Sequence, residues 1–278
     1  MGLTFKPARH TLYLHAQGVM SWPTPGRSAV TPPQAQFPDF VAWCAAHPHS
    51  QARIFVSGHL LHSLVVPPEV VVTDDAALRR YAQQQFGHFH GAAAKEWPLA
   101  VWLRPSSKKH ASAGACALHG VDLAALQSAA KRHGVQLQSV APMWSAGLSS
   151  AAAHLAAREP SYASNQPRAL ALVEKNLVTC MVLKAGAVLA VQQRYLDAGN
   201  PLALPNLLEE VSQESAAQSS PAAWVGWDWQ DDANATATAN ATASKAHGHG
   251  HGLGQGLSPR DPRRAVSEWA LDRVGSTA

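Results

Sequence analysis

The run Gly114–Leu148, GACALHGVDLAALQSAAKRHGVQLQSVAPMWSAGL, decides the fold class because its hydrophobic period changes along its length. It opens with an apolar stretch short enough to be a buried strand. A helix follows, which Asp122 can cap at its start and Gly134 can end. Apolar and polar residues then alternate over 135–140, the pattern of a half-buried strand, and Pro142 opens a second helix. Strand, helix, strand and helix in this order predict an α/β protein.

Before this run, the same periodicities predict further strands and helices. In chain order they are two strands meeting at a turn at Gln17-Gly18, a helix over 37–46, two paired strands over 53–57 and 60–66 joined at Gly58, a helix from Asp74 to Gln85, and a strand over 98–103 that a polar loop joins to a strand over 115–118. The first half of the chain is therefore also predicted to mix helices and strands.

After the run, three strands are predicted in quick succession, over 169–173, 177–183 and 188–193. A polar helix over 204–218 and a closing strand in the Trp-rich segment 223–229 follow. From residue 230 the composition changes to DDANATATANATASKAHGHGHGLGQG, which has too few large apolar side chains to offset the entropy of ordering it. Residues 230–278 are predicted to be a disordered tail that includes a brief amphipathic helix over 265–274.

The composition argues against several classes of protein. Among the 278 residues, 46% are hydrophobic and 14% are charged, so the chain can bury a sizeable core. The net charge of +4 comes from scattered Lys and Arg, whereas a nucleic-acid binder would gather them on one face. No apolar stretch approaches the length of a spanning helix, and no signal peptide is visible. We expect a cytoplasmic protein with no nucleic-acid partner and no direct membrane insertion.

The fifteen histidines raise the possibility of a metal site. His59 and His62 are three residues apart, His88 and His90 are two apart, and His247, His249 and His251 alternate with glycine in the tail. Zinc needs three or four convergent ligands, and the pairs outside the tail have no Cys nearby and no Glu of the metalloprotease type between them. For His59 and His62 we expect a strand–turn pair with one ring facing solvent. The three cysteines are far apart, which indicates small buried side chains and no metal.

Motifs for catalysis and nucleotide binding are missing from the sequence. It contains no GxSxG, no GxxxxGK[ST] and no GxGxxG, so nucleophile-elbow, P-loop and Rossmann mechanisms are not expected. Glu209, Glu210 and Glu214 are predicted to form the solvated face of a polar helix. We therefore expect no catalytic residues.

Two stretches carry a resemblance to a known family. The run Gly114–Leu148 and the segment Arg168–Gly199, RALALVEKNLVTCMVLKAGAVLAVQQRYLDAG, resemble the actin-like proteins of type IV pilus assembly, the PilM family, and the cytoplasmic domain of the type II secretion protein GspL. The resemblance covers about two thirds of the chain. It implies an actin-like, ribonuclease H-like fold, with a first lobe over 1–159, a smaller second lobe over 160–229 and a tail over 230–278.

The sequence departs from this family at the turns that bind phosphate. Where the second lobe of the family has a turn with an Asp and a Gly, this chain has Glu174, Lys175 and Asn176. Without the glycine, a side chain sits where the backbone would approach a phosphate closely. The corresponding turn of the first lobe is at best His15–Gly18, which has no Asp. These departures predict a degenerate phosphate site and no cofactor.

By this resemblance, the chain is expected to be a non-enzymatic scaffold or adaptor in bacterial type IV pilus or type II secretion assembly, docking a partner's peptide or domain. The partners would be proteins of the inner-membrane platform, which places the chain in the cytoplasm or at that membrane through a partner. Trp224, Trp227 and Trp229 are the predicted partner contacts, since Trp is enriched at binding hot spots. Two alternatives stay open: an actin-like or sugar-kinase-like ATPase that retains nucleotide binding, and a metal-dependent hydrolase that uses clustered histidines.

Overall fold

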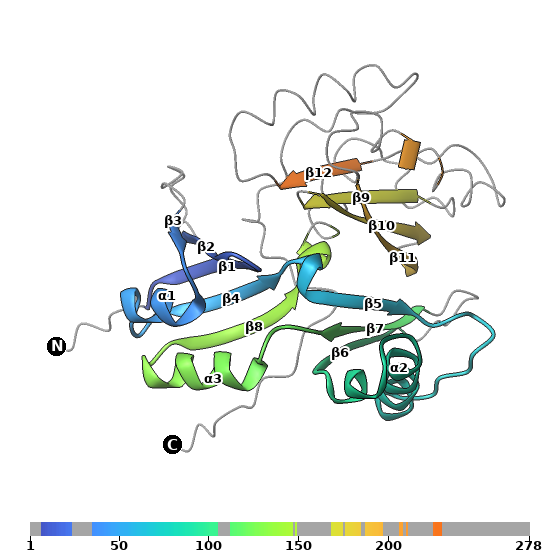
Figure 1. The fold of residues 1–278 in the computed structure, drawn as a ribbon, viewed down its shortest axis with the longest axis horizontal. Helices are drawn as coiled ribbons and strands as arrows, with labels where there is room; N and C mark the ends of the chain where they lie inside the picture. Colours follow the sequence, from blue (N-terminus) through green and yellow to red (C-terminus); the bar gives the residue numbers. More distant parts are fainter. Residues whose placement is uncertain are drawn as a thin grey trace.

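The computed structural model describes residues 7–23, 35–104, 112–146, 148, 168–174, 176–184, 187–196, 206, 207, 210 and 225–229. In this part of the chain the strands form three sheets. Figure 1 shows them with colours that follow the sequence. The predicted boundary at residue 159, the polar helix beyond residue 210 and the whole tail from residue 230 lie outside the described residues.

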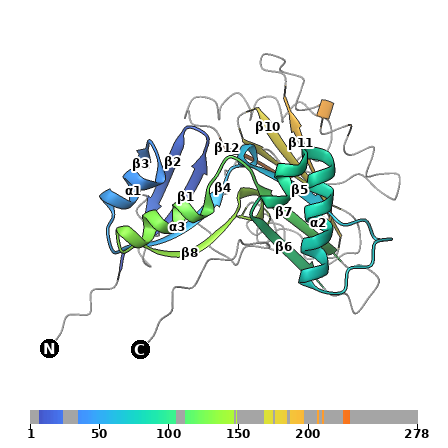
Figure 2. The ribbon, with the colours of Figure 1, turned by 60° about the horizontal axis from the view of Figure 1, so that its bottom comes forward.

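The first sheet has five strands in the order β3-β2-β1-β4-β8. Its strands are β1 (Arg9–His15), β2 (Gly18–Pro23), β3 (Ala35–Phe37), β4 (Gln51–Val56) and β8 (Gln136–Pro142). The first three form an antiparallel meander, while β4 pairs parallel to β1 and β8 pairs parallel to β4. The helices α1 (Phe40–Ala46) and α3 (Leu123–Arg132) lie side by side on one face of this sheet (Figure 2).

Local signals in the sequence set where the helices begin and end. Asp74 and Asp122 cap α2 and α3 as predicted: each side chain accepts a hydrogen bond from the backbone N–H three residues on, at 2.7 and 3.0 Å. Asp39 caps α1 in the same way. Gly134, which was predicted to end α3, has φ +65°, a left-handed conformation that glycine adopts without strain.

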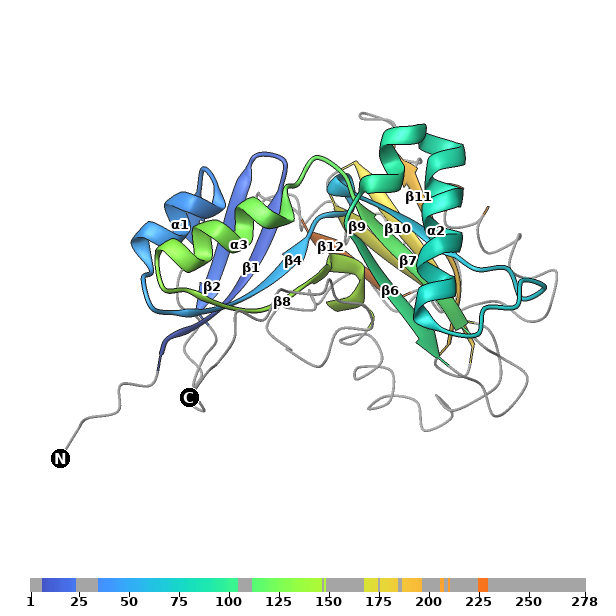
Figure 3. The same cartoon turned by 90° about the horizontal axis from the view of Figure 1, so that it is seen from below.

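The second sheet has three antiparallel strands in the order β5-β7-β6. Its elements are β5 (Leu61–Val65), α2 (Asp75–His90), a short 3₁₀ turn η2 (Ala92–Glu96), β6 (Leu99–Arg104) and β7 (Ser112–Leu118). The pairing predicted between 53–57 and 60–66 is wrong, because β4 belongs to the first sheet and β5 pairs with β7. The 3₁₀ turn η1 (Gly58–Leu60) carries the chain from one sheet to the other. The helix α2 continues beyond the predicted end at Gln85 and packs across this sheet (Figure 3).

The third sheet has four strands in the order β11-β10-β9-β12. They are β9 (Arg168–Glu174), β10 (Leu177–Lys184), β11 (Ala187–Tyr195) and β12 (Val225–Trp229), which confirm the strands predicted after residue 168. The meander β9-β10-β11 is antiparallel, and β12 pairs parallel to β9. The sheet therefore repeats the connectivity of β1, β2, β3 and β4 in the first sheet.

We call the part built from β1–β8 the first lobe and the sheet β9–β12 the second lobe. One hydrophobic core runs through both, since Phe55 and Trp144 of the first lobe belong to the same buried cluster as Leu172 and Met181 of the second. All three cysteines are buried and unpaired, as predicted for small apolar side chains. No helix within the described ranges is long and apolar enough to cross a membrane.

Candidate functional site

The residue that joins the two lobes is Glu174, the last residue of β9. Its side chain is only 1% exposed. Residues two apart on a strand point to the same face, and Leu172, two positions earlier, is also buried. The backbone of β9 therefore aims the carboxyl group of Glu174 inward, toward the first lobe.

Hydrogen-bond donors of the first lobe surround this carboxyl group. The hydroxyl of Tyr13, on β1, donates to Oε1 at 2.8 Å. The backbone N–H of Gly58, in η1, donates to both oxygens, at 3.1 and 3.0 Å. Ser57 makes a further hydrogen bond to the side chain. The carboxyl group is thus held by groups from the strand β1 and from the start of η1, both in the opposite lobe.

Position 58 must be glycine for the carboxyl group to reach this place. A Cβ on Gly58 would lie 2.8 Å from Oε2 of Glu174 and 2.7 Å from Cδ2 of Leu177. Both distances are shorter than a carbon atom tolerates, and both neighbours come from the second lobe. Gly58 is thus a point at which the backbone of the first lobe closely approaches side chains of the second lobe.

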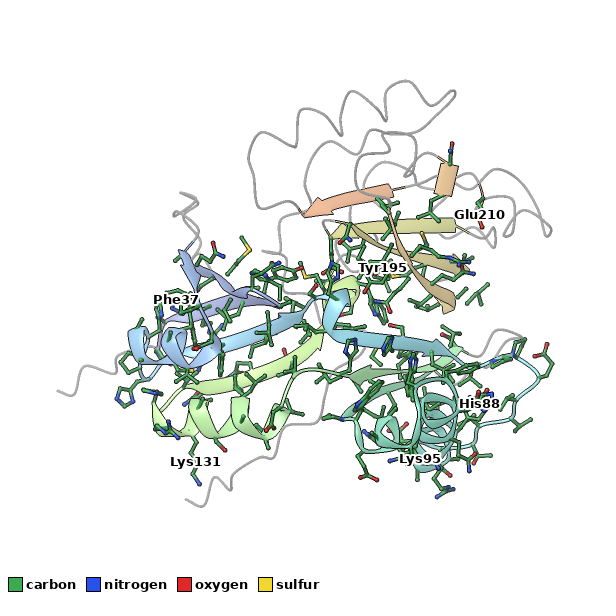
Figure 4. All side chains as sticks on the ribbon, in the orientation of Figure 1. Phe37, His88, Lys95, Lys131, Tyr195 and Glu210 are labelled. Atoms are coloured by element: carbon green, nitrogen blue, oxygen red, sulfur yellow. The ribbon has the colours of Figure 1, made fainter. Side chains whose placement is uncertain are left out.

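Two further polar contacts flank the carboxyl group. Nε2 of His59 lies 3.1 Å from the backbone carbonyl oxygen of Glu174, and Nε2 of Gln193 donates to the carbonyl oxygen of Gly58 at 3.0 Å. The ring of Tyr195 lies 5.7 Å from that of His59, and Figure 4 places Tyr195 beside the meeting point of the lobes. We call Tyr13, Ser57, Gly58, His59, Glu174 and Gln193 the inter-lobe junction.

Burial dominates the electrostatics of Glu174. Removal from water raises the pKa of its carboxyl group to about 7, since the charged form loses its hydration. Hydrogen bonds from Tyr13, Gly58 and Ser57 act in the opposite direction, because they favour the charged form. The junction therefore carries an acid that changes charge near neutral pH.

Of the predicted degenerate phosphate turn, Glu174 enters the junction. Asn176 is exposed at the turn between β9 and β10, and its carbonyl oxygen accepts a hydrogen bond from the N–H of Leu196. Lys175 lies outside the described residues. Glu174, which was predicted only as part of an altered turn, instead fills the space between the lobes with its own side chain.

The corresponding turn of the first lobe, between β1 and β2, is closed in a different way. Gly18 has φ +140°, which side chains rarely allow, and a Cβ there would lie 2.3 Å from the carbonyl oxygen of Phe37. The glycine thus allows β2 to pack against the end of β3. The ring of His15 stacks on that of Tyr13 with 5.3 Å between centroids, so this turn is tied to the junction through Tyr13.

The predicted partner contacts stand on or beside β12. Trp227 and Trp229 pair in register with Leu172 and Glu174 on the parallel strand β9. The side chains of both tryptophans, and all of Trp224, lie outside the described residues. Their role in partner binding stays a prediction.

The histidine pairs do not converge as ligands. The ring of His62 stacks on His90 and His119, with centroids 4.0 and 4.4 Å apart, and on Trp97 at 5.5 Å. Burial and the neighbouring imidazoles lower the pKa of His62 to about 4. Over the described ranges, no group of three or more His, Cys, Asp or Glu is arranged to share a metal ion. His59 belongs to the junction, and His247, His249 and His251 lie outside the described part.

A separate depression of about 210 Å³ opens on β1, β4 and β8, away from the junction. It is lined by Arg9, His10, Thr11, Gln51, Ala52, Arg53 and Gln138. Six of these seven lining residues are polar or charged. It shares no residue with the junction.

Sequence reasoning missed Tyr13 and the dual role of Gly58, which was taken as a simple turn. One signal was present: Glu174 directly follows the strand predicted over 169–173 and lies two residues after Leu172, so a strand one residue longer puts its carboxyl group on the face of that leucine. The partners of the carboxyl group lie 161 and 116 residues away in sequence, and no local pattern indicates them.

Comparison with known proteins identifies the fold. No protein-family model matches the chain, and no curated protein matches it. Among solved structures, the PilM-PilN type IV pilus biogenesis complex matches with a TM-score of 0.58 and 13% identity, over 86% of this chain and 85% of the other. The cytoplasmic domain of EpsL, an inner-membrane component of the type II secretion system of Vibrio cholerae, matches with a TM-score of 0.51 and 12% identity, over 81% and 84%.

A third match is a Bacteroides thetaiotaomicron protein of unknown function with an actin-like ATPase fold, with a TM-score of 0.50 and 10% identity over 84% of this chain and 88% of that one. At such identities the likeness is one of fold. The chain has the actin-like fold, as the resemblance in its sequence predicted.

Proposed function

We propose that this chain is a non-enzymatic scaffold that docks a protein partner in the assembly of a bacterial type IV pilus or type II secretion system. Two of the structures that share its fold come from such systems, and both lie at low sequence identity. The fold therefore supports the setting of this proposal, and the junction between the lobes supports the absence of nucleotide chemistry.

The observation that carries the proposal is the burial of Glu174 between the lobes. A phosphate group placed there would meet a buried carboxyl group that ionises near neutral pH, and like charges repel strongly out of water. The backbone N–H of Gly58, the kind of donor that binds phosphates, is already bonded to Glu174. The residues present therefore do not fit a nucleotide between the lobes.

The junction is equally unsuited to the magnesium ion that accompanies nucleotides. Magnesium binds oxygen ligands, usually one or two carboxylates together with phosphates and water. Here the groups around the Glu174 carboxyl group are donors: two hydroxyls and one backbone N–H. The described residues of the junction include no second carboxylate.

Docking would use sheet edges and the tryptophans near β12. In the described part of the chain β12 is the last strand of its sheet, next to β9. A strand at an edge can accept an extended peptide, whose side chains then find anchors beside it. Trp224, Trp227 and Trp229 would supply such anchors. A partner of this kind would hold the chain at the cytoplasmic face of the inner membrane.

Nucleotide binding is tested by thermal unfolding of the full chain with and without Mg-ATP. A ligand at one hundred times its dissociation constant adds about 2.7 kcal/mol to stability, which is readily seen as a rise in Tm. We expect no rise at millimolar Mg-ATP. A clear rise that is abolished in Glu174→Lys would contradict the scaffold proposal and support an ATPase.

The partner is tested by cross-linking in cells that carry the chain. We expect the tagged protein to cross-link to inner-membrane components of a pilus or secretion system, and the triple change of Trp224, Trp227 and Trp229 to Ala to reduce those cross-links at equal protein levels. If these cross-links survive the triple change, the result would contradict only the proposed role of the three tryptophans. Their absence from the wild-type protein would contradict the proposed setting.

A further inference from the structure

The junction has the composition of an anion-binding site. Its donors are the hydroxyl groups of Tyr13 and Ser57 and the N–H of Gly58, which is the first residue of η1. All of them belong to the first lobe, and all point at the same two oxygen atoms. Such convergent donors, shielded from water, recognise a small planar anion such as a carboxylate.

The occupant of this site comes from the chain itself. Glu174 belongs to the second lobe, yet its side chain takes the hydrogen bonds that an external anion would take. We propose that the pocket formed by Tyr13, Ser57 and Gly58 is a binding site for a carboxyl group, occupied by Glu174, and that this internal ligand fastens the two lobes together.

Surrounding contacts show that the pocket is shaped for this occupant. A Cβ at position 58 would collide with Oε2 of Glu174, so the backbone comes as close as glycine permits. Contacts of His59 and Gln193 on either side align the backbone of β9 and η1 around the carboxyl group.

The inference is independent of the identity of any partner. It concerns the isolated chain, so a failure of the pilus or secretion setting would leave it standing. Conversely, a variant that lacks the Glu174 carboxyl group would not by itself show whether the chain binds a nucleotide or a protein partner.

Chemical rescue tests the proposal on the full chain. In Glu174→Ala the carboxyl group is missing and its donors are left without their partner, so we expect Tm to fall by about 5 °C or more. Sodium formate should then raise the Tm of this variant more than sodium chloride does at equal ionic strength. Wild type and Glu174→Gln, whose side chains fill the pocket, should respond alike to the two salts, and so should the control Glu210→Ala, which removes an exposed carboxylate of the second lobe.

Equal effects of formate and chloride on Glu174→Ala would overturn the proposal. Should that variant fail to fold, hydrogen exchange in Glu174→Gln decides the question. The amide of Gln offers one acceptor and turns an NH₂ group toward a pocket of donors, so exchange at the N–H of Gly58 should speed up by about tenfold or more. Unchanged exchange at Gly58 would overturn the proposal as surely as failed rescue.

Discussion

The two lobes repeat one strand order but differ at the turn that follows their first strand. In the first lobe, β1 and β2 meet at a turn ending in Gly18, whose missing side chain lets β2 approach the backbone at Phe37. In the second lobe, β9 ends at Glu174, whose side chain crosses to the other lobe. The same connectivity therefore supports two different uses of this turn.

By our proposal, a side chain of the chain itself holds the two lobes together, through the hydrogen bonds that Glu174 accepts from Tyr13 and Gly58. A residue without a carboxyl group at position 174 would remove these hydrogen bonds and weaken the contact between the lobes.

The largest expected effect is at the turn of the first lobe. Gly18→Ala introduces a Cβ at a φ of +140° and only 2.3 Å from a backbone oxygen, which cannot move aside. We expect a loss of about 3–5 kcal/mol in the free energy of unfolding, measured by urea denaturation. The control is Gly87→Ala in α2, where the new Cβ meets only the flexible side chain of Lys95 and the change should stay within about 1 kcal/mol. Equal losses at the two positions would refute the packing role of Gly18.

The next effect concerns pH and the turn of the second lobe. The pKa of Glu174 is raised in the folded state to about 7 from 4.5, so the folded protein binds more protons than the unfolded chain between these values. The stability that this group contributes is therefore fully present below about pH 4.5 and is lost as the pH rises through about 7. Between pH 5 and pH 8, the free energy of unfolding of wild type should fall by up to about 3 kcal/mol relative to that of Glu174→Gln.

Comparing wild type with Glu174→Gln cancels the contribution of the other titrating groups. His62 and His119 have lowered pKa values and would destabilise the fold as pH falls, but they do so equally in both proteins. Stability curves measured by urea denaturation across this range should diverge from pH 5 onward and become parallel again above about pH 7. Parallel curves would show that the carboxyl group of Glu174 is not buried as described.

A smaller effect is expected from the hydroxyl group that Tyr13 donates to Glu174 at 2.8 Å. Tyr13→Phe keeps the ring and its packing but removes one donor to a buried carboxyl group, which should cost about 1–2 kcal/mol. Tyr195→Phe, at an exposed ring beside the same junction, should change stability by less than about 0.5 kcal/mol. If the two variants are equally stable, the hydroxyl of Tyr13 contributes nothing to holding the lobes.

The smallest effect is expected at Asn176, the exposed residue of the altered turn. Its backbone oxygen makes the contact to Leu196, and Asn176→Ala leaves that oxygen in place. We expect a change within about 0.5 kcal/mol by thermal or urea unfolding. A loss comparable to that of Tyr13→Phe would mean that the turn as a whole, and not Glu174 alone, replaces the phosphate site.

Much of the fold could be predicted because its signals are local. Asp74 and Asp122 cap their helices through the backbone three residues on, and Gly134 ends α3 within the same turn. Alternation of polar and apolar residues over 135–140 placed the strand β8. The pairing of 53–57 with 60–66 was wrong for the opposite reason: two adjacent strands favour a hairpin, and only the partners of β5 show that it belongs elsewhere.

The sequence by itself determined most of the order of strands and helices, the caps of α2 and α3, and the residues Glu174, Lys175 and Asn176 at the second turn, whereas α1 begins three residues later than predicted and α2 ends five residues later. Only the tertiary structure decided that Glu174 lies against Tyr13 and Gly58, and hence that the altered turn is filled from within. The reason is physical: the direction of a side chain follows from the backbone of its own strand, but its burial depends on what the rest of the chain brings to that face.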